Sequence, residues 1–301
     1  MAKKQAFHCG VVAIVGRPNV GKSTLLNALV GQKVSITSAK PQTTRHRIRG
    51  IKTTENAQLI FVDTPGIHDG ADNQLNRLMN KTAVTSLEDV DAIVFVIEAL
   101  SYTEEDKRVL ELVRRSGKRF FIVVNKIDRP KDKDKLLPFL MELQPQFGTD
   151  SDVIPVSARE GENLERLETL LLAALPEGEA MFPADQATDH SMRFLAAEIV
   201  REKLIRRLSQ ELPYNLAVEI EQFKEEPEKL DIHAIIWVDR QGQKAIVIGK
   251  QGIVLKEVGT KARHDMERLF GQHVYLHLWV KVKEGWSDDM RLLRSLGHNE
   301  E

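Results

Sequence analysis

The stretch GRPNVGKS at residues 16–23 constrains the fold of this chain more than any other. It follows the apolar run of residues 11–15 and precedes a helix-like run at residues 24–29. A strand, a glycine loop and a helix in this order form a phosphate cradle, because the glycines let backbone N–H groups turn toward an anion and the helix N-terminus adds partial positive charge. Lys22 can then reach the β- and γ-phosphates and Ser23 can ligate Mg²⁺. The pattern predicts a nucleotide site without specifying the base.

An ordinary strand-to-helix turn that carries a lysine is the alternative, and the flanking strand and helix argue against it. Mg²⁺ is the expected metal, since it accompanies nucleotide phosphates in such loops. The residues of this loop predicted to contact the nucleotide are Gly16, Arg17, Pro18, Asn19, Val20, Gly21, Lys22, Ser23 and Thr24.

Composition places the chain among ordinary soluble proteins. Its 301 residues, 42% hydrophobic and 29% charged, suffice for about two domains. A net charge of −1 means that any RNA affinity must come from a local basic patch. Cys9 is the single cysteine, which excludes an intramolecular disulfide, and the nine histidines lack zinc-site spacing. Without a long apolar run or a signal-peptide core, we expect a cytoplasmic protein with no transmembrane segment.

A polar loop and a strand end follow the phosphate loop. Residues 33–47 are predicted to form a switch loop whose threonine hydroxyl, from Thr43 or Thr44, closes on Mg²⁺ and the γ-phosphate, although a solvated basic loop would look similar. The next strand ends in Asp63, followed by Thr-Pro-Gly, at the Walker B position. The predicted catalytic residues are Lys22, Ser23, Thr43, Thr44, Asp63 and Gly66, and the predicted magnesium ligands are Ser23, Thr43, Thr44 and Asp63.

A second loop indicates the base. The strand of residues 120–124 is followed by NKID at residues 125–128. The carboxylate of Asp128 can accept hydrogen bonds from the N1–H and 2-amino groups of guanine, which adenine does not offer in that arrangement. Asn125 can bond the base edge, and Lys126 can lie along the ring. We therefore expect GTP rather than ATP.

The last strand of this half, residues 152–156, ends in Ser157 and Ala158, where a backbone N–H can meet the guanine carbonyl oxygen. The four loops occur in order and at strand ends, which is where ligands bind in doubly wound sheets. The predicted fold of this half is an α/β P-loop GTPase domain with a doubly wound, mostly parallel sheet.

A change in composition marks the domain boundary. The helix of residues 164–175 is followed by residues 176–185, which contain prolines and acidic residues and show no helix or strand pattern. We predict a GTPase domain over residues 1–178, a linker over residues 179–187 and a second domain over residues 188–301.

The second domain has the order helix, two strands, Gly-x-x-Gly, helix and strand, with the glycine loop at residues 249–252. This is the order of a KH RNA-binding fold, here predicted as α+β and type II, whose loop clamps about four single-stranded nucleotides. Residues 240–268 hold seven Lys or Arg against three Asp or Glu. A helix-opening turn with a solvated helix face is the alternative. The predicted RNA-binding residues are Ile248, Gly249, Lys250, Gln251, Gly252, Lys256, Lys261 and Arg263.

Taken together, the phosphate loop, Gln42-Thr43-Thr44-Arg45, Asp63-Thr64-Pro65-Gly66, the NKID and Ser-Ala loops and a C-terminal KH loop resemble the Era family over the whole chain. These are bacterial ribosome-associated GTPases with a TrmE-Era-type GTPase domain. The resemblance implies hydrolysis of GTP, binding near the 3′ end of small-subunit (16S) ribosomal RNA, and a role in maturation of the 30S subunit. It also implies peripheral association with the cytoplasmic face of the inner membrane. We expect a monomer.

A GTP-regulated RNA-binding adaptor with little intrinsic hydrolysis is the main alternative. Such a chain would be expected to lack Lys22, Ser23 or Asp63, and all three are present. Ile67 stands where Ras-type enzymes carry the glutamine that orients water, so we expect slow intrinsic turnover. Related GTPases that match this loop suggest that a potassium ion, held partly by Asn19, supplies the missing positive charge.

Overall fold

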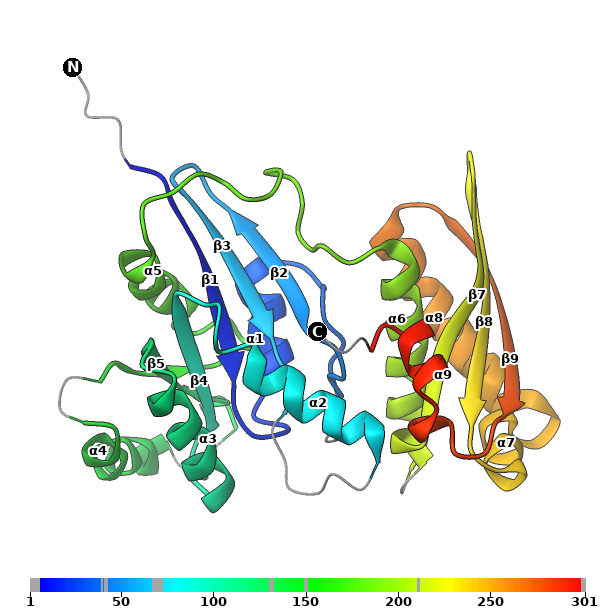
Figure 1. Cartoon of the computed structure of the whole chain (residues 1–301), viewed down its shortest axis with the longest axis horizontal. Coiled ribbons are helices and arrows are strands. Elements are labelled where there is room, and N and C mark those ends of the chain that lie inside the picture. The colour runs from blue at the N-terminus through cyan, green and yellow to red at the C-terminus, as the bar shows by residue number, and fades with distance from the viewer. Residues whose placement is uncertain are drawn as a thin grey trace. The chain divides into compact units, whose positions relative to one another are not determined.

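The computed structural model describes residues 6–38, 40, 43–66, 73–129, 133–148, 151–209 and 212–298. The chain divides into two compact units, each built on its own sheet (Figure 1). The first comprises Met1–Ser35, Thr44–Asp69 and Met79–Asp189, and the second comprises Ile36–Thr43, Gly70–Leu78 and His190–Glu301. Among the residues described, no helix is both long enough and apolar enough to cross a membrane.

The first unit contains a six-stranded sheet in the order β2-β3-β1-β4-β5-β6. All strands run parallel except β2, which pairs antiparallel with β3. The central strands are almost wholly apolar because helices cover both faces of the sheet. The predicted doubly wound, mostly parallel sheet is confirmed, whereas the edge strand β2 was not predicted. The strands are β1 His8–Val15, β2 Ile48–Thr53, β3 Ala57–Asp63, β4 Ala92–Glu98, β5 Arg119–Asn125 and β6 Val153–Val156.

Helices of the first unit pack on both faces of this sheet (Figure 1). Helices α3 and α4 bury Val109 and Phe147 against inward residues of β1, β4 and β5, while α1 packs on β1, β2 and β3 beside α5. Thr103 caps α3, as its sequence indicates, with a reciprocal bond to Asp106. The helices are α1 Lys22–Val30, α2 Gln74–Thr85, α3 Glu104–Arg115, η1 Lys133–Lys135, α4 Leu136–Phe147 and α5 Leu164–Ala174.

The segment after α5 is tied to the first unit by hydrogen bonds. The side chain of Gln58 accepts from the backbone N–H groups of Met181 and Phe182 and donates to the carbonyl of Phe182. The N–H of Ile51 donates to the carbonyl of Ala187 at 2.8 Å. Much of the predicted linker over residues 179–187 is therefore held along the sheet of this unit.

The second unit contains a three-stranded sheet in the order β7-β8-β9, in which β7 and β8 are antiparallel and β8 and β9 are parallel. This arrangement confirms the predicted KH fold. A short helix, α7, precedes the glycine loop and was not predicted. The elements are α6 Met192–Arg207, η2 Leu212–Tyr214, β7 Leu216–Glu226, β8 Lys229–Val238, α7 Gln241–Ile248, η3 Lys250–Gly252, α8 Ile253–Phe270, β9 His273–Val282, η4 Trp286–Asp288 and α9 Met290–Ser295.

Alternation along β8 separates the two faces of this second sheet. Leu230, Ile232 and Ala234 are fully buried against α6 and α8, which cover one face (Figure 1). The residues between them, Asp231 and His233, point to the opposite face and are only partly buried. The core of the unit therefore lies between the sheet and the two long helices.

Candidate nucleotide site and RNA-binding groove

The phosphate loop connects β1 to α1 at the centre of the first sheet. Gly16 and Gly21 adopt positive φ angles of 156° and 102°. A Cβ atom at Gly16 would lie 2.3 Å from the carbonyl oxygen of Val96, and one at Gly21 would lie 2.4 Å from Nδ2 of Asn125. Glycine is required at both positions because neighbouring loops approach the backbone this closely.

Lys22 lies at the start of α1 with only 6% of its surface exposed. Its Nζ donates to the carbonyls of Gly16 at 2.9 Å and Arg17 at 3.0 Å. Burial lowers the pKa of Lys22 to about 8, and the nearby Asp63 carboxylate opposes that shift. The loop carbonyls thus hold the ammonium where phosphate oxygens can neutralise it.

Hard oxygen donors meet around Asp63 at the end of β3. Its Oδ2 accepts from the hydroxyls of Ser23 at 2.6 Å, Ser35 at 3.1 Å and Thr44 at 3.3 Å. The other oxygen, Oδ1, is buried and has no hydrogen-bond partner in the part of the chain that is described. Burial also raises the pKa of this carboxyl. An unpartnered carboxylate oxygen beside hydroxyl groups fits Mg²⁺, which prefers oxygen ligands.

The structure distinguishes the two threonines that the sequence left open. The Thr44 hydroxyl lies 2.8 Å from Oγ of Ser23, inside the cluster around Asp63. The Thr43 hydroxyl instead donates to the carbonyl of Lys40 at 2.6 Å. Thr44 is therefore placed to ligate a metal. Ser35 was missed because an isolated serine in a polar loop carries no pattern.

The turn after Asp63 meets the phosphate loop at Gly66. A Cβ atom at Gly66 would lie 2.9 Å from Cγ of Pro18 and 3.0 Å from its backbone nitrogen. Glycine is thus needed for this close approach. Ile67, to which slow turnover is attributed, and Gln42 lie outside the described residues.

Asn125 connects three loops. Its Nδ2 donates to the carbonyl of Val20 at 2.9 Å, and its Oδ1 accepts from the backbone N–H of Ala158 at 3.1 Å. The side chain is 2% exposed, so its amide joins the phosphate loop to the Ser-Ala loop. The base-edge contact predicted from sequence is therefore not its main interaction here. Asp128 accepts a 2.8 Å hydrogen bond from the hydroxyl of Ser157.

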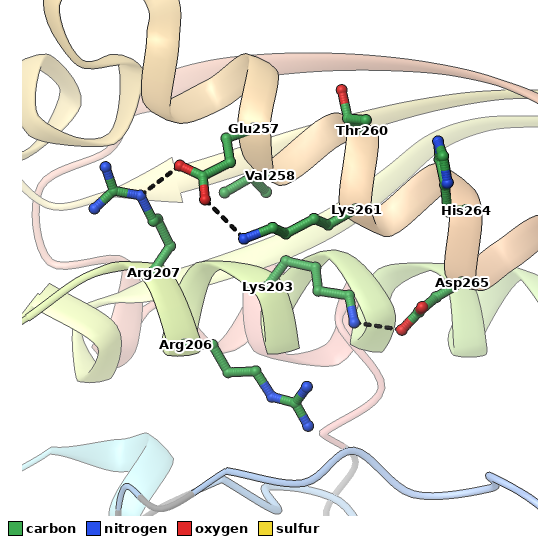
Figure 2. Close-up of a pocket in the computed structure, with 9 residues that line it drawn as sticks. All are labelled: Lys203, Arg206, Arg207, Glu257, Val258, Thr260, Lys261, His264 and Asp265. Atoms are coloured by element: carbon green, nitrogen blue, oxygen red, sulfur yellow. Dashed lines mark hydrogen bonds and ion pairs between the residues drawn. The ribbon is translucent and has the colours of Figure 1, made fainter.

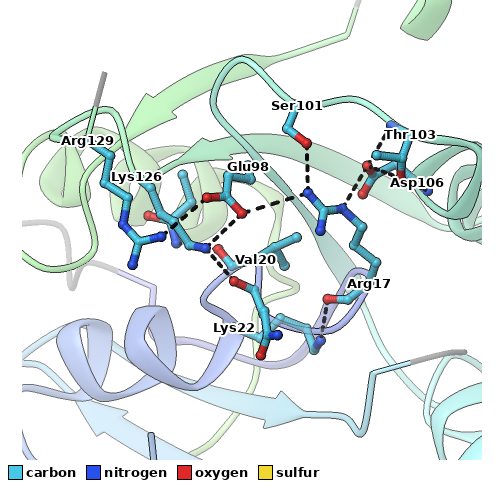
Figure 3. Close-up of polar contacts among 11 residues, drawn as sticks. Arg17, Val20, Lys22, Glu98, Ser101, Thr103, Asp106, Lys126 and Arg129 are labelled. Atoms are coloured by element: carbon cyan, nitrogen blue, oxygen red, sulfur yellow. Dashed lines mark hydrogen bonds and ion pairs between the residues drawn. The ribbon is translucent and has the colours of Figure 1, made fainter. Parts of the chain in front are cut away.

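A carboxylate at the end of β4 links the phosphate loop to the base loop (Figure 3). Glu98 contacts Nζ of Lys126 at 2.8 Å and the guanidinium of Arg17 at 3.7 Å. Arg17 also donates to Asp106 and Ser101, each at 3.0 Å. Its side chain therefore fixes the loop against α3, and only its backbone faces the cradle. Glu98 and Asp106 were missed, although a carboxylate at a strand end was the available signal.

The predicted RNA residues gather at a groove of about 400 Å³ beside α8. Leu276 and Leu278 of β9 supply apolar lining, and Lys256 and Arg263 of α8 supply cations. Gly259 keeps the helix surface flat, since a Cβ there would lie 3.4 Å from Leu278. The groove is lined by Gly252, Leu255, Lys256, Gly259, Thr260, Arg263, Leu276 and Leu278. The leucines were missed because their alternation looked like plain core packing.

The glycine loop lies at one end of this groove. Gly249, Gln251 and Gly252 all have positive φ angles, of 75°, 54° and 76°. Lys250 and Gln251 are exposed. Ile248 instead packs partly against the core of the unit, so its role is to anchor the loop.

Lys261 lies elsewhere. Its Nζ is 2.7 Å from Glu257, which also pairs with Arg207 of α6 at 2.7 Å, and these residues line a second pocket between α6 and α8 (Figure 2). Both bonds lower the pKa of Glu257. This pocket has a volume of about 490 Å³ and is lined by Lys203, Arg206, Arg207, Glu257, Val258, Thr260, Lys261, His264 and Asp265. Ion pairing leaves Lys261 less available to RNA than Lys256.

Family models match both halves of the chain. A model described as 50S ribosome-binding GTPase matches residues 11–126, and a KH domain model matches residues 211–287. The chain is 54% identical over 300 residues to the GTPase Era of Pseudomonas fluorescens (strain Pf0-1), with 100% of both chains covered. It is 55% identical over 295 residues to GTPase Era of Pseudomonas syringae pv. tomato, with 98% of each covered.

Two solved structures are similar over the whole length. One is Era in complex with MgGDPNP and nucleotides 1506–1542 of 16S ribosomal RNA, and the other is a variant of Aquifex aeolicus Era bound to GDP·AlF4⁻. Each has a TM-score of 0.94 and 42% sequence identity, covering 98% of this chain and 100% of its own. The likeness extends across both units.

Proposed function

The chain belongs to the Era family of GTPases, and from this premise we propose that it is a GTP-driven switch that binds 16S ribosomal RNA near its 3′ end during maturation of the 30S subunit. As a GTPase, it converts GTP and water to GDP and phosphate. The adaptor with little hydrolysis is disfavoured because the cluster around Asp63 is intact.

One observation supports hydrolysis most directly, namely the hydroxyl cluster beside the unpartnered oxygen of Asp63. We propose that Ser23, Thr44 and Asp63 hold Mg²⁺, with Asp63 acting through water. When bound, Mg²⁺ neutralises charge on the β- and γ-phosphates. Lys22 adds a cation to the same phosphates, and Thr44 closes the site over them.

The base loop supplies specificity. We propose that Asp128 reads the N1–H and 2-amino groups of guanine, while its bond from Ser157 fixes the carboxylate. Asn125 positions the phosphate and Ser-Ala loops around the nucleotide. The interaction of Glu98 with Lys126 holds the lysine beside the base.

The RNA site is the groove beside α8. The relative named for its complex with nucleotides 1506–1542 binds that RNA, and the groove here offers the glycine loop, two cations and an apolar lining. Single-stranded RNA is recognised through unstacked bases on an apolar surface and cations on its backbone. The function therefore requires both chemistries on one chain.

Coupling between the two chemistries involves the switch loop. Residues 36–43 belong to the second unit, where Glu202 of α6 accepts from the N–H of Thr37 at 3.0 Å and Arg206 donates to the Thr37 hydroxyl at 2.9 Å. We propose that γ-phosphate draws Thr44 into the metal cluster and so changes these bonds. The protein is placed in the cytoplasm as a monomer, and peripheral membrane association stays a prediction.

The test is a single-turnover measurement of phosphate release. We expect slow release from the wild-type chain with Mg·GTP, and release reduced on the order of 10²-fold or more in Thr44→Ala. Thr43→Ala is the matched control and should stay within a few-fold of wild type. Absence of release from the wild-type chain, despite tight GTP binding, would favour the adaptor.

A further inference from the structure

The uncovered face of the KH sheet carries a cluster of ligating side chains. Asp231 and His233 lie on β8 and His277 lies on β9, all on the face opposite the core. The parallel register pairs His233 directly with His277. Two strands far apart in sequence thus bring two imidazoles and a carboxylate together.

Distances within this cluster are those of a site that can close on one ion. Oδ1 of Asp231 is 3.3 Å from Nε2 of His233 and 3.8 Å from Nε2 of His277. One ligand atom from each of the three residues lies within 4.8 Å of the others. Metal–ligand bonds of 2.0–2.2 Å in a tetrahedral site place ligand atoms roughly 3.3 Å apart, so small side-chain movements suffice.

The carboxylate oxygen at the centre is unsatisfied. Oδ1 of Asp231 is buried and accepts no hydrogen bond from the residues that the structure describes. The other oxygen, Oδ2, accepts from Nε2 of Gln222 at 3.3 Å, which fixes the carboxylate plane. A buried carboxylate oxygen without a donor is costly, and a cation in front of it removes the cost.

Aromatic contacts hold the imidazoles in place. The ring of His277 stacks on Trp279 at 5.8 Å, the ring of His233 lies 5.1 Å from Trp279, and the two imidazoles are 4.8 Å apart. Side chains fixed by packing lose little freedom when they bind a metal. Trp279 also supplies a fluorescent reporter beside the cluster.

From this geometry we propose that Asp231, His233 and His277 form a binding site for Zn²⁺, with water completing the coordination. Two imidazoles and one carboxylate suit zinc and the neighbouring transition metals, whereas Mg²⁺ and Ca²⁺ prefer oxygen ligands throughout. The ion joins β8 to β9, whose inward residues Leu276 and Leu278 line the RNA groove. Zinc binding therefore stabilises the strand pair that supports the groove.

The experiment uses full-length protein stripped of transition metals and kept in Mg·GDP, so that the nucleotide site stays occupied. Zn²⁺ is titrated calorimetrically, and Co²⁺ is titrated by its visible absorption and by quenching of tryptophan fluorescence. We expect one Zn²⁺ per chain and a Co²⁺ spectrum typical of tetrahedral nitrogen and oxygen ligands.

His277→Ala removes one ligand at a half-exposed position. Zinc affinity should fall roughly 10-fold to 100-fold or more, since even the outer partners of metal ligands cost that much when removed. Asp231→Asn should weaken binding similarly and keeps the shape of the side chain. His273→Ala is the control, because His273 lies at the start of the same strand with 86% of its side chain exposed.

Stoichiometric binding that His277→Ala and Asp231→Asn weaken, and that His273→Ala leaves unchanged, supports the site. Failure of the wild-type chain to bind Zn²⁺ at 100-fold excess over protein, or equal affinity in all four chains, overturns it.

Discussion

The nucleotide site and the RNA groove are built in opposite ways. Around the nucleotide, Lys22, Asp63 and Asn125 are nearly inaccessible and bonded to one another's loops. Around the groove, Lys250 and Lys256 are exposed, on a helix face and a turn that the core does not need. A change in the first site therefore alters geometry as well as chemistry, whereas a change in the second can alter binding alone.

Base recognition should show the largest effect. In Asp128→Asn, the amide places a donor opposite two guanine donors, so GTP affinity should fall by roughly 10⁴-fold while xanthosine triphosphate binds. Competition binding with both nucleotides measures this. Ser157→Ala removes only the supporting bond to Asp128 and should cost far less. Equal loss in both variants would show that the loop collapsed and that the base was not being read.

The two threonines provide the next comparison. Thr44→Ala removes a hydroxyl from the cluster around Asp63, whereas Thr43→Ala removes one bonded to Lys40. We expect the turnover number to fall on the order of 10²-fold for Thr44 and a few-fold for Thr43. The magnesium dependence of turnover should shift for Thr44→Ala alone. The reverse ranking would reassign the switch threonine.

Burial of Lys22 predicts a pH effect on stability. Its pKa is about 8 when folded against 10.5 ordinarily, so the unfolded chain binds more protons between these values and stability rises with pH there. The contribution is roughly 3 kcal/mol without nucleotide. Urea unfolding should find Lys22→Met more stable than wild type at pH 7.5, with the advantage shrinking toward pH 10. A constant difference across this range would contradict the burial of a charged lysine.

The groove should respond independently of the nucleotide site. Gly252→Asp adds a charge where no atom lies within 4 Å of the new Cβ, so RNA affinity should fall about tenfold or more with GTP turnover unchanged. Gly252→Asn carries the same positive φ penalty without charge and is the control. Gly249 is less suitable, because a Cβ there would lie 2.5 Å from Val254.

Two lysines of α8 sharpen the same point. Lys256→Ala should reduce the salt dependence of RNA binding by about 0.7 per lost phosphate contact, and Lys261→Ala should change it less because Glu257 already pairs with Lys261. Filter binding at several salt concentrations measures both slopes. A steeper loss for Lys261 would move the RNA to the pocket between α6 and α8.

Potassium should give the smallest effect. We expect K⁺ to raise turnover several-fold over Na⁺, since a cation beside the γ-phosphate can replace an arginine finger. Asn19 has a φ of 66°, so Asn19→Ala would strain the loop, and Asn19→Gly removes the amide while keeping that conformation. Turnover in Asn19→Gly should no longer distinguish the two ions. Retention of the full K⁺ effect would exclude Asn19 as a ligand.

Sequence reasoning identified the motifs and missed the contacts between them. The phosphate loop, Asp63 and Asp128 could be predicted because each chemical task restricts residue type and spacing. Glu98, Ser35 and the groove leucines could not, because their roles depend on neighbours that only the fold brings together. The edge strand β2 was hidden by a polar, charged sequence, and α7 by an apolar run that resembled a strand.

The central claim is that GTP in the first unit controls RNA binding in the second. Its most direct test is the affinity of the full chain for a single-stranded RNA from the 3′ end of 16S ribosomal RNA, measured with GDP and with GDPNP. We predict affinities that differ by roughly fivefold or more, with the same factor appearing in nucleotide affinity when RNA is present. Identical RNA affinities in the two states would contradict the account and leave two independent domains on one chain.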